Sequence, residues 1–358
     1  MSKSIDTSKI SKYRDVLLGI ATVMVFWVHL PAIIFKTYTL PIFLLTGGRW
    51  MVTSGVDIFF FLSGMGLYYS MLKKPDVREF YRKRAERVLP ALLIVLIVEA
   101  IMFKNSFGET VKRITLLGFW IDGSRYKWYF ALLIPLYILF PLLFKAVKSG
   151  KLKFPAAIGA SLAVNLILHI CAPEFYDHTI IALSRIPDFL CGVYFSHRMF
   201  TQKKSMEISR SWLYICLTVA LLCVAYIMVL DSSFMQNRLY YICKYILNYR
   251  GISRNYIRPL FMVCLLVLFS CLKLNDGFFR RAAAGISKYS MEVYLLQEEL
   301  QFIIDPLLSS TPAHMHTFLF DIISLALTAA AALLLKKLSG AALRAVKNNK
   351  RKTYASAQ

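Results

Sequence analysis

Residues 55–64 read GVDIFFFLSG, and they place the carboxylate of Asp57 inside an otherwise apolar run. Upstream, residues 13–21 read YRDVLLGIA and open a second apolar run that continues to His29. Downstream, residues 80–90 read FYRKRAERVLP and set a dense cationic cluster at the start of a further apolar segment. Charged and polar groups inside hydrocarbon are costly, so in such positions they usually mark function.

The composition around these stretches is that of a membrane protein. The chain has 358 residues, is 58% hydrophobic and has a mean hydropathy of +0.56. A soluble domain would lack the polar surface to cover so much apolar mass, and apolar stretches near 20 residues are long enough to span a bilayer. We therefore expect an all-α, polytopic integral membrane protein of about ten transmembrane helices.

The expected helices cover residues 15–36, 52–72, 86–104, 127–147, 154–172, 179–197, 211–230, 256–273, 283–305 and 316–338. They form one domain, 15–338, between a cytoplasmic N-terminus at 1–14 and a basic cytoplasmic tail at 339–358. No cleavable signal peptide is expected, since no small-residue cleavage site follows the first span.

The distribution of basic residues supports this topology. Of the 43 Lys and Arg residues, 30 fall in segments expected inside and 12 in segments expected outside, and Arg185 lies within a span. The positive-inside rule then places both termini in the cytoplasm. The net charge of +23 thus reflects short loops, which favours membrane lipids or a phosphorylated ligand over nucleic acid. A bacterial plasma (inner) membrane is the expected location.

The seven cysteines lie mostly in apolar segments without paired spacing. They are typical of small buried hydrophobes rather than of metal ligands or a disulfide framework. No metal site is expected.

Several polar residues fall at a similar depth. At about 1.5 Å of rise per residue, nine of them lie in the middle-to-outer half of the bilayer: His29, Asp57, Ser63, Glu99, Asn165, Arg185, Gln297, Glu298 and Glu299. Together they can line a wet cavity and satisfy one another. Each also has a simpler interpretation: a packing histidine, a helix-end aspartate, a snorkelling glutamate, or an arginine that neutralises Asp188 or another acid.

The cytoplasmic cluster forms a separate feature. Arg84 and Arg87 are three residues apart at a helix start and so share a face, and Arg14 lies at the inner mouth of the first span. Guanidinium groups offer paired donors to phosphate oxygens, so these residues predict a phosphate clamp. The alternative is a topological anchor alone.

The motifs and their order resemble the family-3 membrane acyltransferases (acyltransferase-3 family), which move acyl groups onto cell-surface sugars. The resemblance covers nearly the whole chain. It includes the Asp15-to-His29 spacing, the stretch 55–64 and the Arg84-x-x-Arg87 stretch, with weaker similarity around 128–141, 185–192 and 290–295. The chain departs from many members at Leu18, where they have Arg, at Ile134 in a span where they carry Glu, and at Gln297, where His is common.

The resemblance implies a cytoplasmic acyl-CoA donor, usually acetyl-CoA, as co-substrate without a permanently bound cofactor. The acceptor would be a hydroxyl of an extracytoplasmic saccharide or a polyprenyl-linked glycan. His29 would act as general base, since a free imidazole titrates at about pH 6.5. We expect Asp57 to orient this imidazole, with Glu99 as the alternative acid.

Arg14, Arg84 and Arg87 would bind the nucleotide phosphates of the donor. Ser63, Arg185 and Gln297 are the candidate oxyanion donors. Covalent transfer through an acyl-histidine or acyl-serine stays open.

Two other functions fit the same residues. Intramembrane acids, Arg and His also suit a proton-coupled transporter, although no inverted repeat is evident. A catalytically inactive membrane relative is the third possibility. Residues 231–255 combine Tyr and basic groups, which indicates either acceptor recognition or an interfacial amphipathic helix. The sequence assigns no oligomeric state.

Overall fold

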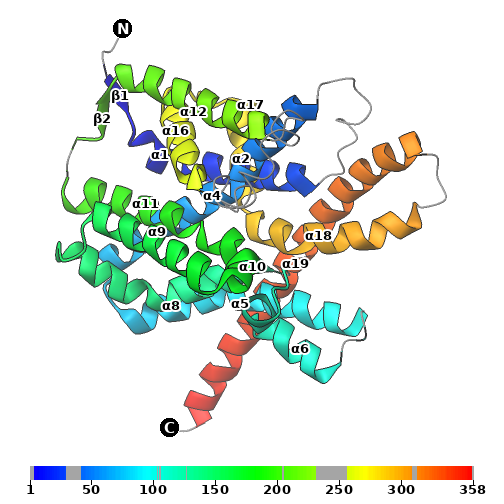
Figure 1. Cartoon of the computed structure of the whole chain (residues 1–358). Coiled ribbons are helices and arrows are strands. Elements are labelled where there is room, and N and C mark those ends of the chain that lie inside the picture. Colours follow the sequence, from blue (N-terminus) through cyan, green and yellow to red (C-terminus); the bar gives the residue numbers. More distant parts are fainter. Residues whose placement is uncertain are drawn as a thin grey trace. The chain divides into compact units, whose positions relative to one another are not determined.

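The computed structural model describes residues 4–29, 42–102, 104, 106–125, 127–203, 205–230, 256–308 and 313–356. Side chains are described for all of these except 42–47, 49, 230, 313–318 and 350–356. Almost all of the described chain is helical (Figure 1). The segment 231–255, for which acceptor recognition was considered, lies outside the described residues.

The helices have the following bounds: α1 Lys9–Lys12, α2 Arg14–His29, α4 Ile42–Lys73, α5 Val77–Met102, α6 Phe107–Ile114, α7 Leu117–Ile121, α8 Trp128–Lys148, α9 Phe154–Cys171, α10 Pro173–Leu183, α11 Ile186–Ser196, α12 Ser211–Leu230, α16 Arg258–Ser270, α17 Phe278–Ser287, α18 Ser290–Leu307 and α19 Ala313–Ser356. A π-helical turn, η1, covers His197–Thr201.

Six helical stretches among the described residues are long and apolar enough to cross a membrane. They are Trp50–Lys73, Trp128–Lys148, Phe154–Cys171, Pro173–Thr201, Ser211–Val229 and Leu319–Asn349. They make the chain a multi-pass helical membrane protein. The other four expected spans fall on α2, α5, α16 and α17–α18, which are shorter or carry more charge. The count of ten and the cytoplasmic termini stay predictions.

Two expected helices are interrupted. The span predicted at 179–197 breaks at Ser184 and Arg185, between α10 and α11. Pro187 has no backbone N–H to bond back to the preceding turn, so it is favoured where a new helix starts. The span predicted at 283–305 begins earlier and breaks between α17 and α18 at Lys288 and Tyr289. The predicted tail at 339–358 continues α19 as helix to Ser356.

The chain divides into two compact units, at 1–28, 34–74 and 139–288 for unit 1, and at 29–33, 75–138 and 289–358 for unit 2. In unit 1, α4 packs along α11 and also contacts α12 and α16. Glycine permits the closest approach, because a methyl group at Gly64 would clash with the Phe189 carbonyl and one at Gly192 with the Phe61 carbonyl. Small residues at crossings let membrane helices approach closely.

Unit 1 also holds a small sheet that an all-α prediction missed. Strands β1 (Ser4–Asp6) and β2 (Glu207–Ser209) pair antiparallel, with Ile5 opposite Ile208. Three residues per strand carry too little alternating pattern to be recognised from sequence. The pairing fixes the N-terminal segment beside the residues that precede α12.

Unit 2 is built around α18, which packs against α19 and α5. In Figure 1, α18 and α19 are the orange and red helices at the C-terminal end of the chain. The chain enters this unit at His29, the last residue of α2. His29 thereby lies in the same unit as the polar residues of α18.

Candidate active site

His29 is held from both sides of its ring by two consecutive residues of α18. Its Nε2 lies 2.8 Å from Glu298 Oε1, and its Nδ1 lies 3.2 Å from Gln297 Nε2. The His29 side chain is 26% exposed and the Glu298 side chain 39% exposed. The ring is therefore fixed in direction while part of it stays accessible to a ligand.

These two contacts determine the tautomer of the imidazole. A carboxylate only accepts, so Nε2 carries the hydrogen and donates it to Glu298. In the neutral ring, Nδ1 then has a lone pair and accepts from the Gln297 amide N–H. A histidine that acts as a general base needs a lone pair on one ring nitrogen, and a carboxylate that accepts from the other nitrogen orients the ring.

A buried ionic network lies beside this trio in unit 2. The Lys127 ammonium is 2.9 Å from Glu299 Oε1 and 3.3 Å from Glu99 Oε1, and it donates to the Leu295 carbonyl oxygen at 2.7 Å. Lys127 is 3% exposed and Glu99 4%. The pairing explains how three charged groups are retained in an apolar setting.

The backbone of Lys127 is also unusual. Its φ is +49°, a left-handed conformation that is uncommon for residues other than glycine. Such conformations persist only where surrounding contacts over-determine them. Here the buried ammonium contacts supply that constraint, since Lys127 is anchored to both α5 and α18.

Glu298 is placed to stabilise an imidazolium on His29. Its carboxylate lies beside Nε2 of the ring, and the Lys127 ammonium also interacts electrostatically with Glu298. The negative charge beside the ring stabilises the imidazolium that forms when Nδ1 takes a proton. The site can therefore accept a proton from a reacting hydroxyl with an opposite charge already in contact with the ring.

Among the described residues, the acid seen in contact with His29 is Glu298, and the orienting roles expected of Asp57 and Glu99 stay predictions. Asp57 is fully buried in unit 1, and its Oδ1 lies 2.7 Å from Arg185 Nε. Glu99 is bound to Lys127. Similar depth in the bilayer brought these acids together in the sequence argument, but depth does not specify which face of a helix a side chain occupies.

Asp57 is the centre of a second buried ionic cluster. Its Oδ2 lies 3.8 Å from Arg258 Nη1, and Asp188, also fully buried, interacts with Asp57 and with both arginines. Arg258 also donates to Thr53 Oγ1. These buried polar contacts join α4, α11 and α16.

The other predicted site residues fall as follows. Ser63 lies partly exposed on α4 of unit 1. Arg14, also in unit 1, places its guanidinium against Gly66, where a methyl group would be 3.0 Å from Nη2. Arg185 is the partner of Asp57, and Asp188 lies close enough to interact with it, as the sequence argument had considered. Gln297 contacts His29 directly.

The cationic cluster of α5 contains two arginines that pair with no carboxylate in the part of the chain that the structure describes. Glu79 pairs with Arg82 and Lys83, whereas Arg84 and Arg87 have no carboxylate partner among the described residues. The Arg84 guanidinium packs 5.4 Å from the Phe80 ring centroid. Burial lowers the pKa of Arg84, and the like charge of Arg87 acts in the same direction. An anion placed there would relieve this repulsion.

Comparison with known protein families indicates the class of reaction. The family model described as Acyltransferase domain matches residues 12–337 of the chain. The chain belongs to the acyltransferase-3 family. No curated protein and no solved structure matches it. Membership of a membrane acyltransferase family confirms the resemblance drawn from the three N-terminal motifs.

Sequence reasoning did not assign three residues that this acyltransferase uses in its polar clusters. Glu298 belongs to the polar run Gln297–Glu299, and the apolar residues around this run indicate that it lies inside a span. Only Gln297 of the three was assigned a role from the sequence. Lys127 and Arg258 lie at predicted helix boundaries and were counted as loop charges. The structure buries both, with exposures of 3% and 8%.

Proposed function

We propose that this acyltransferase moves an acyl group, most simply acetyl, from cytoplasmic acyl-CoA to a hydroxyl of an extracytoplasmic or polyprenyl-linked saccharide. The observation that carries the proposal is the Glu298–His29–Gln297 arrangement, in which an oriented imidazole keeps a lone pair on Nδ1. Family membership supplies the reaction class, and the loop charges support a cytoplasmic donor side.

The donor enters from the basic end of α5. Arg84 and Arg87 bind the nucleotide phosphates, because they face one side of the helix and have no carboxylate partner among the described residues. Arg84 precedes Glu99 by 15 positions on α5, which corresponds to about 22 Å of helix rise. The slender pantetheine arm spans this interval, so that the thioester reaches the layer of Glu99 and Lys127. The phosphate-binding role expected of Arg14 stays a prediction from the sequence.

The acceptor hydroxyl binds at Nδ1 of His29 and displaces the Gln297 amide. His29 takes the hydroxyl proton while the oxygen attacks the thioester carbonyl. The carbon–sulfur bond then breaks, and the thiolate leaves with the proton that His29 returns. The products are the acyl ester and free CoA, so atoms and charge balance without a further co-reactant.

Gln297 matches both protonation states of His29. Its amide N–H donates to neutral Nδ1, and its buried Oε1, which has no hydrogen-bond partner among the described residues, can accept from Nδ1–H after the amide rotates. While the acceptor occupies Nδ1, the amide N–H is free for the carbonyl oxygen of the intermediate. Of the three candidate oxyanion donors, Gln297 is the one supported by a direct contact with His29.

Mass spectrometry of envelope glycans tests the proposal directly. Cells that produce the protein should carry glycans with an added ester mass, and cells that lack it or carry His29→Ala should not. In proteoliposomes, labelled acetyl should appear on the acceptor only when acetyl-CoA is present on the cytoplasmic face. Proton-coupled solute flux without acyl-CoA would favour the transporter alternative, and an acceptor complex without transfer would indicate an inactive relative.

A further inference from the structure

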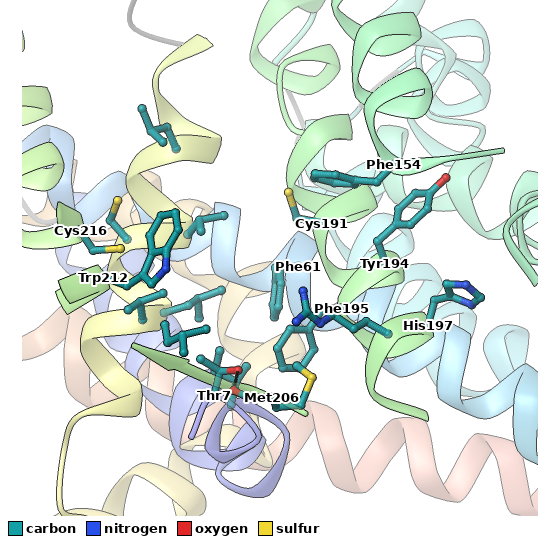
Figure 2. A pocket seen from close by; sticks show the side chains of 18 of the residues that line it. Thr7, Phe61, Phe154, Cys191, Tyr194, Phe195, His197, Met206, Trp212 and Cys216 are labelled. Atoms are coloured by element: carbon teal, nitrogen blue, oxygen red, sulfur yellow. Dashed lines mark hydrogen bonds between the residues drawn. The ribbon is translucent and has the colours of Figure 1, made fainter. Parts of the chain in front are cut away.

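Unit 1 contains a long groove that the proposed reaction does not use. Its volume is about 850 Å³, and its walls come from α11 on one side and α12 and α16 on the other. Figure 2 shows Trp212 and Cys216 on one wall, with Phe61, Cys191 and Tyr194 across from them. Most of the lining is apolar, which favours a hydrocarbon chain as occupant.

One end of the groove is basic. Lys153 and Arg198 line it, together with the polar residues Thr7, His197 and Gln202, and the lining includes no Asp or Glu. Neither cation pairs with a carboxylate in the part of the chain that the structure describes. This end therefore has the charge that complements an anionic head group.

The direction of Arg198 is set by the π-helical turn η1. His197 Nδ1 lies 2.7 Å from the Tyr68 hydroxyl, and His197 Nε2 lies 3.2 Å from Gln202 Nε2. The next residue, Arg198, donates to the Ser205 carbonyl oxygen at 3.5 Å, beside β2. π-Turns inside helices recur at functional sites, because the extra residue redirects the side chains that follow.

The groove extends from this basic end into the apolar part of unit 1. Lys153 directly precedes α9, Arg198 follows the end of α11, and Trp212 lies in the first turn of α12. Leu260 also lines the groove and precedes the end of α16 by ten residues, or about 15 Å of rise. A groove with basic residues at its mouth and about 15 Å of apolar wall complements an amphiphilic ligand.

We propose that this groove binds an anionic glycerophospholipid, with its phosphate between Lys153 and Arg198 and one acyl chain along α12 and α16. The helix ends at the basic mouth belong to the side that the loop charges assign to the cytoplasm, where anionic head groups face basic residues. This inference goes beyond the proposed reaction and does not depend on His29.

Native mass spectrometry of the purified full chain tests it. Phosphatidylglycerol should bind about tenfold more tightly than phosphatidylcholine with the same acyl chains. The reason is that each basic residue contributes favourable binding free energy toward an anionic lipid head group. Lys153→Gln with Arg198→Gln should abolish the preference. Lys151→Gln with Arg210→Gln removes the same charges from exposed positions outside the lining, and this control should retain it.

A second pair of variants tests the apolar part. Val263→Trp fills the groove and should lower the affinity for phosphatidylglycerol about tenfold, while Leu222→Trp, on an exposed face of α12 outside the lining, should not. Equal binding of the two lipids, or an equal loss of preference in both double variants, would overturn the proposal. So would displacement of the lipid by acetyl-CoA or by a polyprenyl phosphate at tenfold lower concentration. His29→Ala should bind the lipid with wild-type affinity, so the lipid proposal can be tested independently of the proposed acyl transfer.

Discussion

The Glu298 carboxylate lies 2.8 Å from Nε2 of His29, so the histidine that the sequence placed in a membrane layer has an acid that fixes its tautomer. Glu298→Gln removes the charge and keeps the shape. We expect kcat for acyl transfer to fall by about 10²- to 10⁴-fold with an unchanged KM for the donor, because the acid stabilises the imidazolium that forms in the transition state.

The control for this variant is Glu109→Gln, which changes an exposed acid of the same unit and should leave kcat at the wild-type value. Steady-state kinetics with labelled acetyl-CoA measures both constants. An equal kcat for Glu298→Gln and wild type would remove Glu298 from the catalytic arrangement.

Lys127 is predicted to be the main electrostatic support of unit 2. Lys127→Met leaves Glu99 and Glu299 buried without their cation, which should cost about 3–5 kcal/mol of unfolding free energy. Lys112→Met breaks an exposed pair with Asp122, 2.8 Å long, and should change the unfolding free energy little, because water screens exposed ion pairs. Thermal unfolding in detergent compares the two. If both variants melt alike, the buried network carries no stability.

Asp57 is predicted to act on stability instead of on the chemical step. Asp57→Asn leaves Arg185 and Arg258 with a missing buried counter-charge, so the unfolding free energy should fall by about 3–5 kcal/mol. Replacing Arg185 with Met in the same chain should restore part of it, because the two residues are coupled. A folded Asp57→Asn protein with normal stability and a reduced kcat would instead support the orienting role expected from sequence.

The donor clamp is tested by substitution on one turn of α5. Arg84→Gln with Arg87→Gln should raise the KM for acetyl-CoA about tenfold or more, since charge-assisted hydrogen bonds to phosphate are lost. Arg82→Gln with Lys83→Gln removes two charges that already pair with Glu79 and should change KM little. With acetyl-pantetheine, which lacks the nucleotide phosphates, both double variants should equal wild type. A KM shift of the same size with that substrate would contradict the clamp.

The sequence predicted the helical membrane fold because apolar length is a local property that each segment carries by itself. It also placed His29 and Gln297 in one polar layer, and the structure joins them at 3.2 Å. It did not single out Glu298 within the run 297–299, because the partner of His29 depends on which helix faces pack together. Lys127 and Arg258 were counted as loop charges, because a basic residue beside a span ordinarily indicates only the membrane topology.

Helix interruptions were predicted less well. The apolar pattern of 179–197 does not predict the break at Ser184 and Arg185. The one local indication is Pro187, which follows the break. The break has a function in the packing, because Arg185 at this point reaches the buried Asp57. Such contacts between distant segments are tertiary, and no local pattern encodes them.

The central claim is that His29 is the base that activates the acceptor hydroxyl. Its most direct test is the single-turnover rate of labelled acetyl transfer in proteoliposomes that contain His29→Ala at wild-type density. We expect this rate to fall by about 10²- to 10⁴-fold, with acetyl-CoA still bound at wild-type affinity. Transfer at the wild-type rate in that variant would contradict it.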